Sequence, residues 1–171
     1  TFPERFAARA AECDLIFASH VFFRSGPEFE TVFDLARLSR PQGPWLVVDG
    51  YDGFRALPTD LSGIADRVFY LGGGYKYAMA GEGAAFMHAP EGSGERPRVT
   101  GWYAEFGDLE GPPGGVGYVR DAGRFLGATF DPSGLYRFNA AARMLAGEGL
   151  TTGAIAGHVA RLHGDLLSCV H

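Results

Sequence analysis

Lys76 is the residue of this chain whose surroundings most clearly suggest chemistry. It lies in a segment of glycines and tyrosines, residues 72–77, directly after an apolar run at 68–71. A lysine at the end of a buried strand is partly desolvated, which lowers the pKa of its amine and favours attack on an aldehyde. The glycines let a bulky ligand approach the backbone, and Tyr75 offers a hydroxyl to an anion such as a phosphate. The alternative interpretation is a lysine that extends from the strand end to reach water.

The glycines before Lys76 do not form a nucleotide-binding P-loop. Their spacing differs from that motif, and neither Ser nor Thr follows the lysine.

Asp49 ends a second apolar run, residues 45–48. A carboxylate at the end of a buried strand needs a cationic or hydrogen-bonding partner to offset its loss of water. The protonated nitrogen of a pyridine ring is one such partner, and a carboxylate that holds this proton makes the ring strongly electron-withdrawing. The alternative interpretation is an aspartate that caps a loop or a helix.

The pattern of apolar runs predicts an α/β fold. Continuous apolar runs predict buried strands at residues 15–18, 45–48, 68–71 and 84–87. Helical periodicity predicts helices at residues 4–12, 28–38 and 133–146, and another after Thr151 or Thr152. Continuous apolar strands separated by helices are typical of a mostly parallel sheet covered by helices on both faces.

Three polar groups follow three of these strands. Ser19 and His20 follow the first, Asp49 ends the second, and the loop 72–76 follows the third. Ligands of parallel sheets bind beyond the carboxyl ends of the strands. We therefore expect these groups to meet at one edge of the sheet. The segment 90–127, rich in Gly and Pro but with interspersed aromatic residues, predicts an ordered excursion or a domain junction.

Composition makes several classes of function unfavourable. The net charge of −5, the pI near 5.5 and the lack of a basic stripe argue against a nucleic-acid partner. The apolar runs are too short to span a membrane. The five histidines do not have the spacing of a metal site, so we predict no metal. Cys13 and Cys169 form no CxxC pair and are predicted to be reduced, buried residues of a cytoplasmic protein.

The chain resembles the class V aminotransferase superfamily, which belongs to the fold-type I pyridoxal-phosphate enzymes. The residues that carry the resemblance are Asp49-Gly50-Tyr51-Asp52-Gly53, Tyr75-Lys76-Tyr77 and Gly81-Glu82-Gly83. Ser19-His20-Val21 with Gly26, and Tyr75-Lys76-Tyr77, are most similar to kynureninase-like members. The resemblance extends from about residue 14 to about residue 145.

This resemblance implies a cofactor and a set of site residues. Pyridoxal 5′-phosphate would form a Schiff base with Lys76, which would then move protons at Cα of an amino-acid substrate. Asp49 would pair with the pyridine nitrogen, and Tyr75 would bind the phosphate. Ser19, His20 and Asp52 would be further cofactor-binding residues on this chain.

The resemblance also implies a homodimer with shared active sites. Gly101-Trp102 is similar to the family's segment that reaches a phosphate across the dimer interface. Thr129 resembles a second contact of this kind. The alternative interpretations are a core aromatic residue for Trp102 and an ordinary loop hydroxyl for Thr129.

Two departures from the family pattern stand out. Asp52 occupies a position near the cofactor's phenolic oxygen where the family usually has His or Gln, so we expect Asp52 to point away or to alter the electronics there. The family's ring-stacking aromatic and phosphate-binding loop would precede residue 1, and its substrate-carboxylate arginine would follow residue 171. We therefore interpret residues 1–130 as the later half of the large domain, and 131–171 as linking helices that open the small domain.

Three functions are consistent with the sequence. The first is a transferase or lyase that uses pyridoxal phosphate and Lys76 on an amino acid. Transamination, Cβ–Cγ cleavage, elimination and epimerisation all remain open, whereas desulfuration is disfavoured because Cys169 lies in a predicted helix. The second is a non-catalytic fragment or split subunit that needs an N-terminal half. The third is a doubly wound module that binds a small molecule or a phosphate and is unrelated to pyridoxal phosphate.

Overall fold

The computed structural model describes residues 2–10, 12–39, 43–111 and 117–170. The chain divides into two compact units. Unit 1 comprises Thr1–Pro90 and Ser133–His171, and unit 2 comprises Glu91–Pro132. Unit 1 contains the sheet and is described first.

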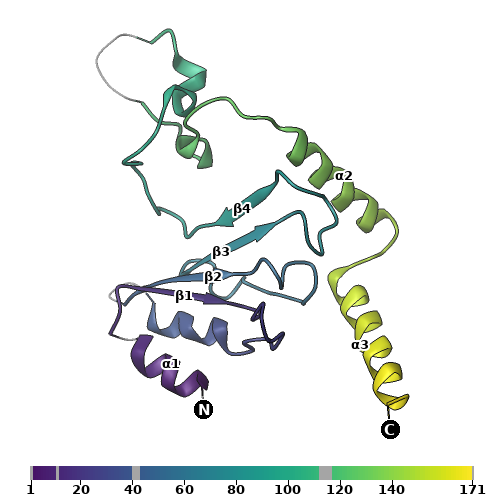
Figure 1. The fold of residues 1–171 in the computed structure, drawn as a ribbon. Helices are drawn as coiled ribbons and strands as arrows, with labels where there is room; N and C mark the ends of the chain where they lie inside the picture. The colour runs from purple at the N-terminus through teal and green to yellow at the C-terminus, as the bar shows by residue number, and fades with distance from the viewer. Residues whose placement is uncertain (1, 11, 40–42, 112–116, 171) are drawn as a thin grey trace. The chain divides into compact units, whose positions relative to one another are not determined.

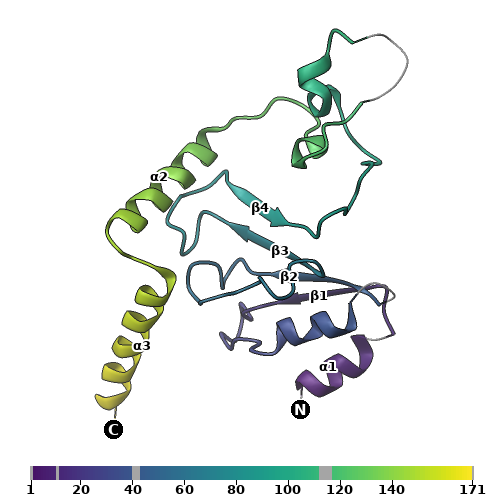
Figure 2. The same cartoon turned by 180° about the vertical axis from the view of Figure 1, so that it is seen from behind.

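Within the described residues, the sheet of unit 1 has four strands in the order β1-β2-β3-β4 (Figure 1). The strands are β1 (Leu15–Ser19), β2 (Trp45–Asp49), β3 (Val68–Gly73) and β4 (Ala85–His88). The first three are parallel, and β4 pairs with β3 in the antiparallel direction. Seen from behind, β4 forms the edge opposite β1 (Figure 2). All four strands were predicted, and the mostly parallel α/β architecture is confirmed.

One face of the sheet forms the hydrophobic core. Helix α1 (Phe2–Ala10) and the 3-10 helix η1 (Val32–Leu38) supply side chains that pack against this face. Alternate strand residues such as Ile16, Leu46 and Val68 are almost fully buried here. Because side chains of a strand alternate between faces, burying this set points the intervening residues the other way.

The opposite face is apolar and exposed. Leu15 and Phe17 on β1 and Met87 on β4 are 54, 55 and 55% exposed. Trp45 and Phe69 form an edge-to-face pair on this side at 5.3 Å. The prediction that helices cover both faces is therefore not met within the described residues.

Helix η1 is shorter than the predicted helix at 28–38. The segment before it folds back on the end of β1, because Val21 and Glu28 form an antiparallel bridge and the amide of Phe29 donates to His20 O. This extended pairing takes the backbone of Glu28 and Phe29 out of the helix.

Two long helices follow unit 2 along the chain. Helix α2 spans Ser133–Gly147, as predicted from residue 133, and α3 spans Thr152–Ser168. Thr151 caps α3 by accepting a hydrogen bond from the amide of Ala154. Among the described residues, no helix is long and apolar enough to cross a membrane.

The cysteines differ from their predicted burial. Cys13 lies just after α1 and Cys169 is the C-cap residue of α3, and both are exposed free thiols. Cys169 follows a helix with no buried residue among those described, and Cys13 lies beyond the last residue of α1, so neither thiol reaches the core.

The described part of unit 2 contains two short 3-10 helices, η2 (Trp102–Asp108) and η3 (Ala122–Phe125). An aromatic group formed by Trp102, Tyr103 and Phe106 lies on η2. The carboxylate of Glu105 accepts a hydrogen bond from the amide of Gly117 at 3.0 Å. The described residues of unit 2 thus form local structure of their own, and the choice between an excursion and a domain junction stays a prediction.

Candidate functional site

Asp49 is held at the carboxyl end of β2 by two uncharged donors. The parallel register places Ser19 opposite Asp49, and Ser19 Oγ donates to Asp49 Oδ2 at 3.2 Å. The backbone amide of Tyr51 donates to Asp49 Oδ1 at 3.1 Å. Each carboxylate oxygen has capacity for more than one hydrogen bond, so both can accept another donor. The carboxylate is therefore oriented without having its charge neutralised.

Lys76 has a charged partner. Its Nζ lies 2.5 Å from Asp52 Oδ1, and the two side chains are 21 and 25% exposed. The ammonium group also lies over three aromatic rings, with Nζ 5.5 Å from the centroid of Phe23, 5.9 Å from Tyr51 and 5.7 Å from Tyr75. Such contacts stabilise a cation through the negative face of the ring. Asp52 is therefore the counter-ion of Lys76, and its orientation toward a cofactor stays a prediction.

These surroundings set the direction of the Lys76 pKa. Burial opposes the charged form, but the hydrogen bond to Asp52 and the charges of Asp52, Tyr75 and Asp49 outweigh it and raise the pKa of Lys76 above its ordinary value. The sequence predicted a lowered pKa from burial alone. That prediction is wrong for this structure because it omitted the carboxylate of Asp52.

The loop that carries Lys76 is tied to the sheet and to α2. The amide of Ala80 donates to Gly74 O at 2.7 Å, which closes the backbone around the lysine. Arg137 on α2 donates through Nε to Ala80 O at 3.4 Å and through Nη2 to Glu82 O. Arg137 is a positioning residue that sequence reasoning missed. The sequence showed only that Arg137 is a basic residue on a predicted helix, more than fifty residues after the loop that it contacts.

His20 lies on the core side of the site. Its side chain is 2% exposed, its Nε2 lies 3.1 Å from Glu28 Oε1, and its ring packs edge-on against Phe33 at 4.9 Å. The other nitrogen, Nδ1, has no hydrogen-bond partner within the described residues. A Cβ added to Gly53 would lie 2.6 Å from Nδ1. His20 therefore packs beneath the loop that carries Asp52, and its contact with a cofactor remains a prediction.

The remaining predicted site residues fall into two groups. Tyr75 is 47% exposed beside Lys76, and its ring lies 5.4 Å from that of Tyr51. Trp102 and Thr129 belong to unit 2 and are both exposed. A Cβ on Gly101 would lie 1.9 Å from Gly127 O, so the segments that carry Trp102 and Thr129 run side by side. The contacts of all three with a cofactor remain predictions.

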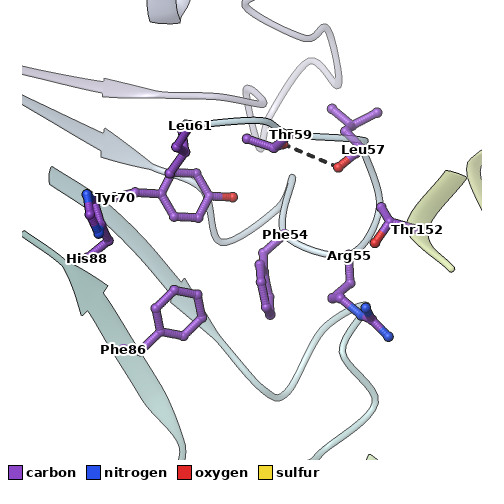
Figure 3. Close-up of a pocket in the computed structure, with 9 residues that line it drawn as sticks. All are labelled: Phe54, Arg55, Leu57, Thr59, Leu61, Tyr70, Phe86, His88 and Thr152. Carbon is purple, nitrogen blue, oxygen red and sulfur yellow. Dashed lines mark hydrogen bonds between the residues drawn. The ribbon is translucent and has the colours of Figure 1, made fainter. Parts of the chain in front are cut away.

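A cavity of about 370 Å³ lies near the core side of β3 and β4 (Figure 3). The rings of Phe54, Tyr70 and Phe86 line it, and Arg55 and Thr152 lie at its other end. Burial, together with the charge of Asp49, raises the pKa of Tyr70 to about 12. The lining residues do not include the ion pair of the candidate site, so the cavity is separate from it.

The composition of basic residues adds a signal that the motif analysis missed. Of the fifteen lysines and arginines, fourteen are arginines and Lys76 is the one lysine of the chain. A guanidinium keeps its proton at all ordinary pH values and does not act as a nucleophilic amine. Lys76 is therefore the single side chain able to form a Schiff base. Among the described residues, no group of three or more His, Cys, Asp or Glu side chains is arranged to hold a metal.

Comparison with known proteins bears on the fold. No protein-family model matches the chain. The chain is 34% identical over 109 residues to isopenicillin N epimerase from Streptomyces clavuligerus, a match that covers 63% of this chain and 27% of the epimerase. It also resembles the apo structure of a cysteine desulfurase from Thermococcus onnurineus, with a TM-score of 0.69 and 19% identity. That match covers 86% of this chain and 36% of the desulfurase.

These similarities confirm the predicted fold. The chain has the architecture of part of a fold-type I pyridoxal-phosphate enzyme. The cofactor that the sequence resemblance implies, pyridoxal 5′-phosphate, stays a prediction for this chain. The chain spans about a quarter to a third of the length of these two proteins.

Proposed function

We propose that this chain is part of a pyridoxal-phosphate-dependent class V enzyme that acts on an amino acid, with Lys76 as the residue that attaches the cofactor. One observation carries the proposal. The single lysine of the chain lies at the carboxyl edge of a parallel sheet, on the loop after β3, with Asp49 oriented at the end of the neighbouring strand. This is the edge at which α/β sheets bind ligands.

The residues present fit the cofactor chemically. Asp49 keeps hydrogen-bonding capacity for a pyridine N–H, and the exposed hydroxyl of Tyr75 is suited to a phosphate oxygen. When bound, pyridoxal phosphate supplies an electron-withdrawing ring conjugated to the amino acid's Cα. Lys76 Nζ would remove or return the proton at Cα. Trp102 and Thr129 would reach the phosphate of a second subunit in a homodimer.

The reaction type depends on what happens after a proton leaves Cα. An epimerase returns the proton to the other face of Cα, an aminotransferase gives up the amino group of the substrate, and a lyase breaks a further bond of the substrate. We infer amino-acid transferase or lyase chemistry of the kynureninase-like kind from the resemblance around Ser19 and Tyr75. Epimerisation is the competing reaction, supported by the 34% identity to isopenicillin N epimerase. We further propose a cytoplasmic enzyme.

The first test is covalent trapping of the cofactor. The purified chain is incubated with pyridoxal 5′-phosphate, reduced with borohydride and mapped by peptide mass spectrometry. We expect a visible absorption band before reduction and a pyridoxyl group on Lys76 afterwards. Lys76→Arg is the matched variant, because it keeps the positive charge and leaves the chain with no lysine. Labelling confined to the N-terminal amine in both proteins would refute the proposal for this chain.

A second candidate is a non-catalytic fragment or split subunit that needs an N-terminal half. The observation in its favour is the exposed apolar face of the sheet, with Leu15, Phe17 and Met87 each more than half exposed. Apolar patches of this kind drive association. Sedimentation of the isolated chain distinguishes the two candidates. Aggregation supports the split subunit, and so does a cofactor absorption band that forms only after an N-terminal half is added. A soluble dimer of this chain that forms the cofactor absorption band without any added partner supports the enzyme hypothesis.

A further inference from the structure

Asp52 has a contact that the proposed cofactor chemistry does not require. Its Oδ1 lies 2.5 Å from Lys76 Nζ, the shortest ion pair for which the structure gives a distance among the described residues. The pair is about three-quarters shielded from solvent on each side, with exposures of 21% for Lys76 and 25% for Asp52. An ion pair that is partly shielded is stronger than one in open water, because less solvent screens it.

The other groups around Lys76 act in the same direction. Asp49 at the end of β2 contributes negative charge, as does Tyr75 when ionised, and the rings of Phe23, Tyr51 and Tyr75 face the ammonium group. The nearby cation on α2, Arg137, is bound to backbone carbonyls of the loop. The described surroundings thus favour the protonated form of Lys76, and Asp52 is the nearest contributor.

A protonated lysine cannot attack an aldehyde, because its nitrogen has no free electron pair. The ammonium group must first give one proton to Asp52 or to solvent. The neutral amine then forms a bond to the aldehyde carbon, and the carbonyl oxygen leaves as water with the two remaining protons of the nitrogen. The product holds a C=N double bond, and no oxidant or reductant takes part.

We propose that Asp52 is a built-in counter-ion that controls the reactivity of Lys76, so that the Asp52–Lys76 ion pair must open before the amine can attach an aldehyde. Attachment is then slow at neutral pH and accelerates as the solution becomes alkaline. The part of this inference that concerns attachment of the cofactor rests on the proposed function. The part that concerns the reactivity of the Lys76 amine rests only on the ion pair with Asp52.

The experiment compares the unmodified chain with Asp52→Asn and Asp66→Asn. Asparagine keeps the shape of aspartate and removes its charge. Asp66 is the matched control, since it pairs with Arg67 at 3.2 Å on the surface of the same unit and is 78% exposed. Because the chain holds one lysine, isotope-labelled lysine gives a single side-chain NMR signal. That signal reports the protonation of Lys76 and the folded state of each variant.

Two aldehydes are used as probes across pH ~6 to ~10. Formaldehyde with cyanoborohydride measures the reactivity of Lys76 without a cofactor site, and the N-terminal amine serves as the internal reference. Pyridoxal 5′-phosphate measures attachment of the cofactor. In Asp52→Asn we expect the Lys76 titration to move to lower pH and both attachments at neutral pH to become about tenfold faster. Asp66→Asn should behave as the unmodified chain.

The outcomes separate the two proposals. An Asp52→Asn protein whose Lys76 titrates and reacts with formaldehyde as in the unmodified chain would overturn the counter-ion role. A shifted titration and faster reaction with formaldehyde, with no pyridoxal phosphate on Lys76 at any pH, would support the counter-ion role and refute the proposed function.

Discussion

Asp49 and Asp52 are three residues apart, yet the structure treats their carboxylates differently. Asp49 is oriented by a serine hydroxyl and a backbone amide, neither of which carries charge. Asp52 is bound to an ammonium group at 2.5 Å. The carboxylate of Asp49 is oriented but has no cation bound to it among the described contacts. The carboxylate of Asp52 is already paired with the ammonium group of Lys76.

This difference follows from where each residue lies. Asp49 is the last residue of β2, so its neighbours are fixed by the strand register with Ser19. Asp52 lies in the following turn, whose direction depends on Gly50, Gly53 and the side chains beneath it. The strand register places uncharged hydrogen-bond donors beside Asp49. The turn places the carboxylate of Asp52 against Lys76 on a different loop. The two carboxylates should therefore respond in opposite ways when their charge is removed.

The largest effect is expected for Asp49→Asn. Loss of the charge that would face the pyridine nitrogen should weaken binding of pyridoxal 5′-phosphate about a hundredfold, equivalent to roughly 3 kcal/mol. An absorbance titration at fixed pH measures this. Asp52→Asn is the contrasting variant, since it should speed attachment. If both variants weakened cofactor binding equally, the distinction between the two carboxylates would be wrong.

The next largest effect is a loss of folding stability at alkaline pH, which we attribute to Tyr70 near Asp49. Its pKa is raised from 10.0 to about 12 by burial and by the charge of Asp49. A pKa raised on folding contributes stability that is complete below pH 10 and is lost as the pH rises toward 12. The free energy of unfolding should fall by roughly 2–3 kcal/mol over this interval because of Tyr70.

The variant that tests this is Tyr70→Phe. It removes the titrating hydroxyl, so the alkaline loss of stability measured by urea unfolding should become smaller. Tyr77→Phe is the control, because Tyr77 is 51% exposed. An identical alkaline decline in the unmodified chain and in Tyr70→Phe would contradict the assignment to Tyr70.

A smaller loss of stability is expected for Gly53→Ala, which crowds His20 against the turn that carries Asp52. The new Cβ would lie 2.6 Å from His20 Nδ1, and His20 is enclosed by Phe33 and Glu28. Crowding of this kind should lower the free energy of unfolding by about 2 kcal/mol. The lysine NMR signal should also move, since Asp52 shifts with the turn. Gly63→Ala is the control, with no atom within 4 Å of the added Cβ. Equal stability of the two variants would show that His20 does not support the turn.

The smallest effect is expected from Ser19→Ala. It removes one neutral donor from Asp49, while the amide of Tyr51 remains. The stability should fall by about 1 kcal/mol, and the cofactor affinity should change by only a few-fold. Urea unfolding and the same absorbance titration measure the two quantities. A loss as large as that of Asp49→Asn would mean that Ser19 does more than orient the carboxylate.

Sequence patterns located the strands well and the loops less well. The run at residues 45–48 became β2 because apolar β-branched residues bury best in a central strand. The same reasoning placed Ser19 and Asp49 at one edge, where they meet. The direction of β4 was not predictable from its own apolar run, because local composition is the same for parallel and antiparallel pairing.

The sequence by itself determined the chemical inventory of this site. It supplied one lysine on a glycine-rich loop after a strand, an aspartate at the end of the preceding strand, and the resemblance that joins them. These features are local, so spacing and residue type were enough to find them. Lys76 and Asp52 could not be paired this way, because they are 24 residues apart and meet only where two loops approach. The tertiary structure alone decided that a carboxylate holds the reactive amine, that His20 packs into the core, and that Arg137 anchors the lysine loop.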